Sequence, residues 1–164
     1  RKNAFRYAGI VEMAYLLDDM TVEIIADGIH LPADLLKFVY KFKGPYKTAL
    51  ITDSMRGAGM PDGKSVLGKR DNGLEVIIED GVAKLPDRSA FAGSVATADR
   101  LLRNMLKCGV PLCDAVRMLT INPLSMMNLD LKKGRLIAGF DADICVFDGD
   151  VNVKHVICNG EIVA

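Results

Sequence analysis

Apolar positions in the first third of the chain alternate between helical stripes and short continuous runs. The apolar spacing over residues 10–17 predicts a helix, and the run after it predicts a buried strand that breaks at Asp27. A second helical stripe ends at Gly44-Pro45, and the run Ala49–Ile51 predicts a second buried strand. Because helix and strand alternate with short connections, the pattern favours parallel β-α-β units and an α/β fold.

The middle of the chain changes from helical to strand-like spacing. Residues 74–78 and 81–85 are two apolar runs joined by a short acidic turn, which predicts a β-hairpin. The segment Phe91–Ser94, FAGS in the sequence, predicts a glycine-containing turn that leads into a helix. Apolar residues at i, i+3, i+4, i+7 and i+8 from Ala98 indicate that helix, and Gly109 is predicted to end it.

The last third begins with one more helical pattern and ends in strands. The helix is predicted to end at Asn122-Pro123. Beyond Gly134 the helical period disappears, and Asp143–Phe147 is predicted to be a strand. Residues 153–164 are predicted to form a hairpin that turns at Asn159-Gly160. This tail is therefore expected to be a β element separate from the α/β part.

Composition and charge narrow the classes of function. The chain has 164 residues, 50% of them hydrophobic, with 21 basic and 21 acidic side chains, so it can bury an ordinary globular core. Zero net charge gives no support for nucleic-acid binding or for electrostatic attachment to a membrane. No apolar run approaches the ~18 residues of a membrane span, and no signal peptide is recognisable. The four cysteines match no zinc or redox spacing, so they are expected to be small buried residues of a protein from a reducing compartment.

One stretch, Thr48–Gly63, carries the strongest indication of chemistry. Its apolar start ends on Asp53, and a loop rich in glycine follows. Barrels of the α/β class place catalytic groups at the carboxyl ends of buried strands, so Asp53 is a candidate catalytic carboxylate. The alternative is that Asp53 only caps a turn, which is a common role of aspartate in loops.

Further polar groups are expected beside Asp53. Asp27 and His30 follow the neighbouring strand, so they converge with Asp53 and the FAGS segment if the β-α units stand side by side. His30 is then a candidate for substrate binding, although a lone histidine in a loop is often a structural hydrogen-bonding residue. His155, in the terminal hairpin, is interpreted as structural.

Basic residues precede the first predicted helix. Arg1, Lys2 and Arg6 lie there, and an arginine beside a helix N-terminus forms a natural anion site. The alternative is that these side chains are merely solvated, so the pattern by itself decides nothing.

Four motifs occur in order along the chain: ADGIH at 26–30, TDSM with the following GAGMPDG at 52–63, FAGS at 91–94, and a closing G-x-L-x-x-G-x-D-A-D at 134–143. Together they resemble the N-acetylglucosamine-6-phosphate deacetylases, a family of metal-dependent amidohydrolases. The likeness runs from about Arg6 to the end of the chain. The closing pattern is shared by many amidohydrolases, whereas the combination of DGIH, TDSM and FAGS is more specific.

The resemblance implies a TIM-type (β/α)8 barrel that carries a small β-sandwich domain built from both chain ends. A closed barrel needs about 250 residues, so this chain is expected to be the carboxyl-terminal part of a longer enzyme. Residues 1–128 would form part of the barrel, with a β-hairpin insertion near 66–90, and residues 129–164 would supply strands of the sandwich. An incomplete barrel exposes sheet edges and apolar helix faces, so it is expected to pack against the missing amino-terminal half.

The resemblance also implies roles for particular residues. Asp53 would be the general acid and base of the reaction. The implied contacts to the sugar phosphate are Asp27, Gly28, Ile29, His30 and, on the neighbouring subunit's substrate, Arg6. The implied lining of the sugar site is Phe91, Ala92 and Gly93. The context Arg6-Tyr7-Ala8-Gly9 departs from the family's usual R-E-P-G, which makes Arg6 the least secure of these assignments.

A divalent metal, zinc or iron, is implied for the full-length enzyme. Its family ligands, a glutamate and two histidines, belong to earlier strands and lie outside this chain, in which Asp53 is the single candidate for facing the metal. The metal would polarise the amide and activate water, and Asp53 would move the proton. The implied reaction converts N-acetylglucosamine 6-phosphate to glucosamine 6-phosphate and acetate, in the amino-sugar catabolism of the cytoplasm. A homodimer is implied by the role of Arg6, and the chain alone is expected to be inactive.

Two alternatives stay open at this point. Another metal-dependent amidohydrolase, such as a cyclic-amide hydrolase or a nucleobase deaminase, would share Asp53 and the β tail but would not need to hold a phosphate. A non-catalytic α/β binding module would use Asp53 as a turn residue and the glycines as structural residues. Activity on phosphorylated and unphosphorylated amino sugars separates the first alternative from the deacetylase, and metal dependence separates the second.

Overall fold

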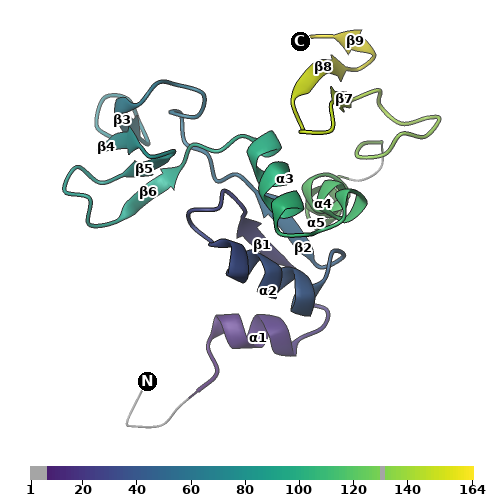
Figure 1. The fold of residues 1–164 in the computed structure, drawn as a ribbon, viewed down its shortest axis with the longest axis horizontal. Coiled ribbons are helices and arrows are strands. Elements are labelled where there is room, and N and C mark those ends of the chain that lie inside the picture. The colour runs from purple at the N-terminus through teal and green to yellow at the C-terminus, as the bar shows by residue number, and fades with distance from the viewer. Residues whose placement is uncertain (1–6, 130–131) are drawn as a thin grey trace.

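The computed structural model describes residues 7–129 and 132–164 (Figure 1). The helices are α1 (Ile10–Leu16), α2 (Ala33–Lys43), α3 (Ala98–Lys107), α4 (Leu112–Leu119) and α5 (Ile121–Met126). The strands are β1 (Val22–Ile25), β2 (Thr48–Ile51), β3 (Gly63–Leu67), β4 (Leu74–Glu79), β5 (Val82–Lys84), β6 (Phe91–Ser94), β7 (Ile144–Phe147), β8 (Val153–Cys158) and β9 (Glu161–Ile162). Within the described ranges, none of the helices is long and apolar enough to cross a bilayer.

The centre of the molecule is a β-α-β unit, and the α/β prediction is confirmed there. Strands β1 and β2 pair in parallel, with Val22 opposite Thr48 and Ile25 opposite Ile51, and α2 is the crossover between them. Gly44, with φ of 75°, ends α2 in a conformation that suits glycine. The carboxyl ends of β1 and β2 therefore lie at the same edge of the strand pair.

The main hydrophobic core surrounds this unit. It combines side chains from α2, β1, β2, α3 and α4, and its largest fully buried members are Leu36, Leu101, Met105 and Met118. Leu101 and Met105 belong to the apolar stripe that predicts α3, so the helical period of the sequence identifies the face that packs inward. Strand β2 contacts four helices, α2, α3, α4 and α5, and so lies at the centre of the packing.

The middle of the chain forms a four-stranded antiparallel sheet in the order β3-β4-β5-β6 (Figure 1). The predicted hairpin is confirmed as β4 and β5, but the sheet extends beyond it on both sides. The prediction of a turn at FAGS is wrong, because these residues form β6. Lys84 of β5 pairs with Phe91, and Ser54 forms a parallel bridge with Ser94, so partners on two sides hold the backbone extended.

Two helices occur where the sequence predicts one that ends at Asn122-Pro123. Thr120, with φ −121° and ψ −75°, interrupts the helical path, and α5 then includes both Asn122 and Pro123. Proline is tolerated there because N–H groups in the first helical turn have no partner within the helix. The buried side chain of Asn122 donates hydrogen bonds to the carbonyls of Pro45 and Thr48, at 2.5 and 2.6 Å, and so ties α5 to the start of β2.

The carboxyl-terminal strands form a separate antiparallel sheet in the order β7-β8-β9 (Figure 1). The predicted turn is confirmed, since Asn159 and Gly160 join β8 and β9 with φ of 50° and 85°. Positive φ at both positions matches the type of tight turn that asparagine-glycine pairs favour. The prediction of buried cysteines is wrong: Cys113, Cys145 and Cys158 are exposed and Cys108 is half-buried. The small sheet has too little covering structure to bury its cysteines, and Cys113 lies on the outer face of α4.

Large apolar side chains remain exposed at both ends of the described chain. On α1, Ile10 is 72% exposed and Val11 64%, and on α2 Phe42 is 59% exposed. Leu136 before β7 and Ile162 of β9 are 75% and 72% exposed. Exposed apolar side chains in such numbers are typical of regions that pack against another polypeptide.

Candidate active site at the carboxyl ends of β1 and β2

The loop after β1 holds a buried carboxylate and a histidine in fixed relation. Asp27 is 1% exposed, and its Oδ1 accepts hydrogen bonds from the backbone N–H groups of Ile29 and His30, both at 2.9 Å. Its Oδ2 lies 2.7 Å from Nδ1 of His30. Gly28 permits this tight loop with φ of 80°. Because Asp27 engages Nδ1, a ligand would meet the His30 ring through Nε2.

The contacts of Asp27 determine its ionisation state. Burial raises the pKa of its carboxyl, but the hydrogen bonds from Ile29 and from the side chain and backbone of His30 outweigh burial and hold the pKa below the ordinary value. Asp27 is therefore an anion at neutral pH, and its charge fixes the orientation of His30.

Asp53 lies two residues beyond the end of β2 and is exposed. Its φ of 47° is in the left-handed region, which aspartate adopts less readily than glycine and which is found at functional loops. The N–H of Ser94 donates to the carbonyl of Asp53 at 3.3 Å, and the N–H of Met55 donates to the carbonyl of Ser94 at 2.9 Å. These bonds to β6 hold the turn, while the carboxylate of Asp53 stays accessible to a ligand.

A hollow of about 450 Å³ opens beside Asp53. It is lined by Asp53, Ser54, Met55, Leu67, Phe91, Ala92 and Gly93. The Phe91 ring also lies 5.1 Å from the His30 ring, centroid to centroid, at an interplanar angle of 55°. The hollow therefore has a carboxylate on one wall and an aromatic ring on another, and that ring is in contact with the imidazole of the β1 loop.

Most of the residues singled out from the sequence meet in this region. Asp27, Gly28, Ile29 and His30 form the β1 loop, Asp53 follows β2, and Phe91, Ala92 and Gly93 belong to β6. Arg6 lies outside the described residues, as do Arg1 and Lys2. His155 lies in β8, exposed and paired with Val146, away from these groups.

Sequence reasoning missed several residues of the site. Leu67 reaches the hollow from β3, a strand that the pattern did not predict. Arg100 and Asn104 of α3 bind the β1 loop, and their only signal in the sequence is a pair of polar residues four positions apart beside an apolar stripe. Met55 of the TDSM motif also lines the hollow with a buried side chain, and the sequence pattern gives no signal of that burial.

The described residues do not fit a metal ion by themselves. Within 7–129 and 132–164, no group of three or more histidine, cysteine, aspartate or glutamate side chains is arranged to hold one. A hydrolytic zinc site generally takes three protein ligands, and Asp53 supplies a single carboxylate.

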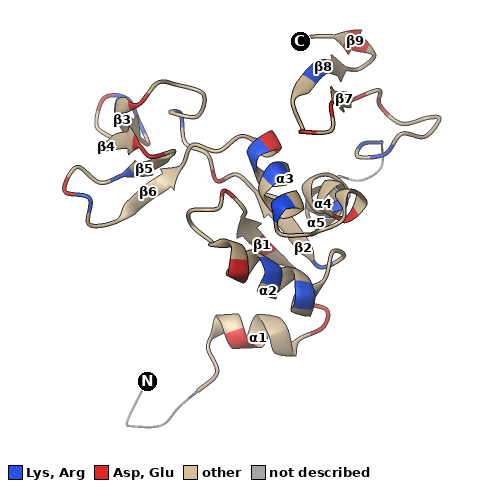
Figure 2. Cartoon of the chain, in the orientation of Figure 1, with Lys and Arg blue, Asp and Glu red and all other residues tan. Residues whose placement is uncertain are grey.

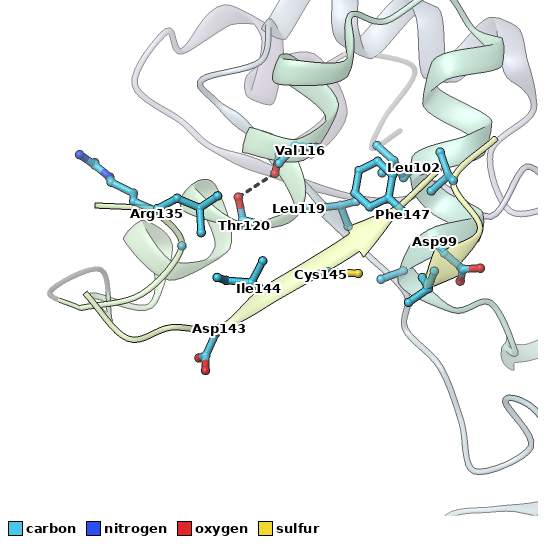
Figure 3. Close-up of a pocket in the computed structure, with 15 residues that line it drawn as sticks. Asp99, Leu102, Val116, Leu119, Thr120, Arg135, Asp143, Ile144, Cys145 and Phe147 are labelled. Atoms are coloured by element: carbon cyan, nitrogen blue, oxygen red, sulfur yellow. Dashed lines mark hydrogen bonds between the residues drawn. The ribbon is translucent and has the colours of Figure 1, made fainter. Parts of the chain in front are cut away.

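A larger cavity, of about 480 Å³, lies between α3, α4 and the β7 strand (Figure 3). Leu102, Leu119, Ile144 and Phe147 give it apolar walls. Within it, the Thr120 hydroxyl donates to the Val116 carbonyl at 2.8 Å and so is occupied by its own helix. The two carboxylates on its walls, Asp99 and Asp143, form ion pairs with Arg103 and Lys133. The carboxylate of Asp53 is exposed beside its own hollow, so that hollow is the better candidate for catalysis.

Comparison with known proteins agrees with the architecture. The sequence profile of the amidohydrolase family matches residues 5–163. The chain is 34% identical over 158 residues to an N-acetylglucosamine-6-phosphate deacetylase from Lysinibacillus sphaericus, covering 96% of this chain and 39% of that protein. It is 32% identical over 145 residues to an N-acetylgalactosamine-6-phosphate deacetylase from Escherichia coli, covering 87% of this chain and 37% of that protein. The chain thus spans about two fifths of the length of these curated relatives.

A solved structure shows the same likeness in three dimensions. The crystal structure of N-acetylglucosamine-6-phosphate deacetylase from Thermotoga maritima superposes with a TM-score of 0.85 at 36% identity. The superposition covers 95% of this chain and 42% of that one, so nearly every described element has a counterpart in it.

Proposed function

The chain belongs to the amidohydrolase family, and from this premise we propose that it is the carboxyl-terminal part of an N-acetylglucosamine-6-phosphate deacetylase. The proposed reaction hydrolyses the N-acetyl group of N-acetylglucosamine 6-phosphate to give glucosamine 6-phosphate and acetate. The proposed complete fold is a TIM-type barrel with a small β-sandwich, in which residues 1–128 and 129–164 contribute to the two parts. Two relatives named as N-acetylglucosamine-6-phosphate deacetylases, one of them a solved structure, support the assignment.

The observation that supports this proposal most is the meeting of three elements beside one hollow. Asp53 and Phe91 line the hollow, and His30 contacts Phe91 from the β1 loop. The site therefore offers a carboxylate suited to proton transfer, an imidazole suited to an anion and an aromatic face suited to a sugar ring, which match the parts of a sugar-phosphate amide.

Asp53 is proposed as the proton carrier. Its carboxylate takes a proton from a water molecule as the water oxygen bonds to the acetyl carbon. The protonated carboxyl then gives that proton to the sugar nitrogen as the carbon–nitrogen bond breaks, which releases the free amine and acetic acid. The acid becomes acetate by giving its proton to the amine or to solvent. Exposure of Asp53 toward the hollow gives water and substrate access to its oxygens.

The β1 loop is proposed to hold the phosphate. Nε2 of His30 would bind a phosphate oxygen, and the segment Asp27–Ile29 would shape the loop around it. Arg6 is proposed to reach the phosphate of a neighbouring subunit in a homodimer, and Phe91–Gly93 to line the sugar. Contacts to the phosphate lie far from the bond that breaks, so they contribute orientation rather than proton transfer.

The divalent metal of the family is proposed to be held by residues of the amino-terminal part that the longer relatives contain. The described residues of this chain supply at most Asp53 to such a site. A cytoplasmic location is also proposed, where sugar phosphates are metabolised and where thiols stay reduced; all four cysteines are unpaired thiols.

A second candidate substrate is N-acetylgalactosamine 6-phosphate. The E. coli relative named for that substrate is 32% identical, close to the 34% of the L. sphaericus relative, so identity alone does not separate the two sugars. They differ in the configuration at one ring hydroxyl. The residues that line the sugar would have to distinguish the two configurations.

The test is acetate release by the complete enzyme from a panel of four amides. The panel contains both N-acetylated hexosamine 6-phosphates, unphosphorylated N-acetylglucosamine and a cyclic amide. We expect the highest kcat/KM on N-acetylglucosamine 6-phosphate. A higher kcat/KM on N-acetylgalactosamine 6-phosphate would make that sugar the substrate. A higher kcat/KM on the cyclic amide would overturn the proposed function.

A further inference from the structure

Helix α3 sends two polar side chains to the loop that carries His30. Arg100 donates from Nε to the carbonyl of Asp27 at 3.1 Å, and Asn104 donates from Nδ2 to the carbonyl of Ala26 at 3.0 Å. The two residues are four positions apart and therefore lie on the same face of the helix. Both bind backbone carbonyls, so they fix the path of the loop itself.

Arg100 also reaches a second element. Its Nη1 donates to the carbonyl of Gly81 at 2.9 Å, in the turn between β4 and β5. A Cβ at Gly81 would lie 3.0 Å from that Nη1, and a Cβ at Gly28 would lie 3.0 Å from Nδ2 of Asn104. A side chain at Gly28 or Gly81 would therefore crowd the polar group of α3 that binds that turn. Figure 2 shows the basic residues along α3, at the junction of the central unit and the antiparallel sheet.

The two carbonyls that Arg100 binds belong to the two parts of the molecule that form the site. The Asp27 carbonyl lies in the loop that presents His30, and the Gly81 carbonyl lies in the sheet whose last strand presents Phe91. The guanidinium group is planar and holds its donors at fixed separations, unlike the single ammonium of lysine. Arg100 therefore bridges the two parts through one rigid group, in a structure in which the His30 and Phe91 ring centroids lie 5.1 Å apart.

We propose that Arg100 is a positioning residue that joins the His30 loop to the antiparallel sheet and so holds His30 and Phe91 together at the substrate site. Its consequence for catalysis rests on the proposed function, in which His30 binds phosphate. The placement of the His30 ring by Arg100 does not depend on the proposed function.

The kinetic test uses the complete enzyme with three variants. Arg100→Met keeps an unbranched apolar stem but removes every donor. Arg100→Lys keeps the charge but gathers its donors on one nitrogen, so it loses the fixed Nε–Nη1 separation that spans the two carbonyls. Arg103→Met is the matched control, because Arg103 lies on the same helix but binds the Val151 carbonyl at 2.8 Å and the side chain of Asp99, neither of which belongs to the β1 loop. We expect Arg100→Met to raise KM for N-acetylglucosamine 6-phosphate about tenfold, Arg100→Lys to raise it less, and Arg103→Met to leave it unchanged. A residue that only stabilises the fold would lower the active fraction and leave KM alone, so an unchanged KM in Arg100→Met would overturn the kinetic part.

The geometric test does not depend on activity. In histidine-labelled complete enzyme, the imidazole nitrogen signals of His30, assigned with a His30→Gln variant, should shift or broaden in Arg100→Met. The signals of His155 serve as an internal reference, and Arg103→Met should leave both residues unchanged. If the wild-type enzyme releases no acetate but the His30 signals respond as expected, the proposed function fails and the positioning role stands. If the His30 signals are the same in wild type and Arg100→Met, the positioning role is wrong.

Discussion

The Nδ1 atom of His30 lies 2.7 Å from Oδ2 of Asp27, a carboxylate that is almost completely buried. The same carboxylate also accepts two backbone N–H groups of its own loop. Residues 27–30 thus contain the Asp27 carboxylate, the His30 ring that it orients and the backbone N–H groups that stabilise the carboxylate. The arrangement presents Nε2 of His30 as a fixed donor or acceptor at the carboxyl end of β1.

The first prediction concerns recognition of the phosphate. His30→Ala in the complete enzyme should weaken productive binding of the phosphorylated substrate by ~1.5–3 kcal/mol, the usual magnitude for a charge-assisted hydrogen bond. Arg6→Ala should behave in the same way, while turnover of unphosphorylated N-acetylglucosamine should change little in either variant. His155→Ala, the matched control in β8, should match wild type on both substrates. Equal losses on the two sugars would show that His30 and Arg6 do not contact phosphate.

The second prediction concerns the pH dependence of stability. The hydrogen bonds to Asp27 lower its pKa in the folded state, so they stabilise the fold fully above the ordinary pKa of about 4 and less as pH falls through the folded-state value. At pH 7, Asp27→Asn should therefore reduce the free energy of unfolding by roughly 1.5–3 kcal/mol, the range for a hydrogen bond to a charged group. Urea unfolding of the wild type and of Asp27→Asn between pH 7 and pH 2 should show the difference in their free energies of unfolding decrease as the pH is lowered. A gap that stays constant over this range would contradict an ionised Asp27.

The third prediction concerns residues 1–164 expressed alone. The described residues assemble no set of three metal ligands, so the purified chain should bind no stoichiometric divalent metal and release no acetate. Exposed apolar residues such as Ile10, Phe42 and Ile162 should also make it prone to association. Elemental analysis and light scattering are the measurements, and co-expression with the amino-terminal part of a relative is the positive control. One tightly bound zinc or iron per chain, together with turnover, would show that this chain builds a complete site.

Local patterns in the sequence were enough to identify the central elements. The strands that carry Asp27 and Asp53, the α3 stripe and the Asn159-Gly160 turn all depend on interactions between near neighbours, and all are observed. The β6 strand could not be found in this way. Phe91–Ser94 is four residues long and contains a glycine, and its extended form depends on pairing with β5 and with Ser54, 40 residues earlier in the chain.

The candidate site was predictable to a similar extent. Asp53 and His30 stand out because each follows a buried strand, which is where α/β barrels place catalytic and binding groups. Arg100 does not stand out, since a polar residue on a helix surface is usually solvated. Its role follows only from the distances that join it to the carbonyls of Asp27 and Gly81.

The last prediction tests the role of Asp53 directly. In the complete enzyme, Asp53→Asn keeps the size of the side chain but cannot accept and return a proton, so kcat for acetate release from N-acetylglucosamine 6-phosphate should fall by several orders of magnitude while KM changes little. Asp62→Asn, a change at an exposed residue of the loop between β2 and β3, is the matched control and should keep wild-type kcat. Steady-state kinetics of the three proteins, with equal folded fractions checked by circular dichroism, is the deciding measurement. Loss of kcat in Asp53→Asn alone is the predicted result, and retention of even a tenth of wild-type kcat would contradict the assignment of Asp53 as the proton carrier.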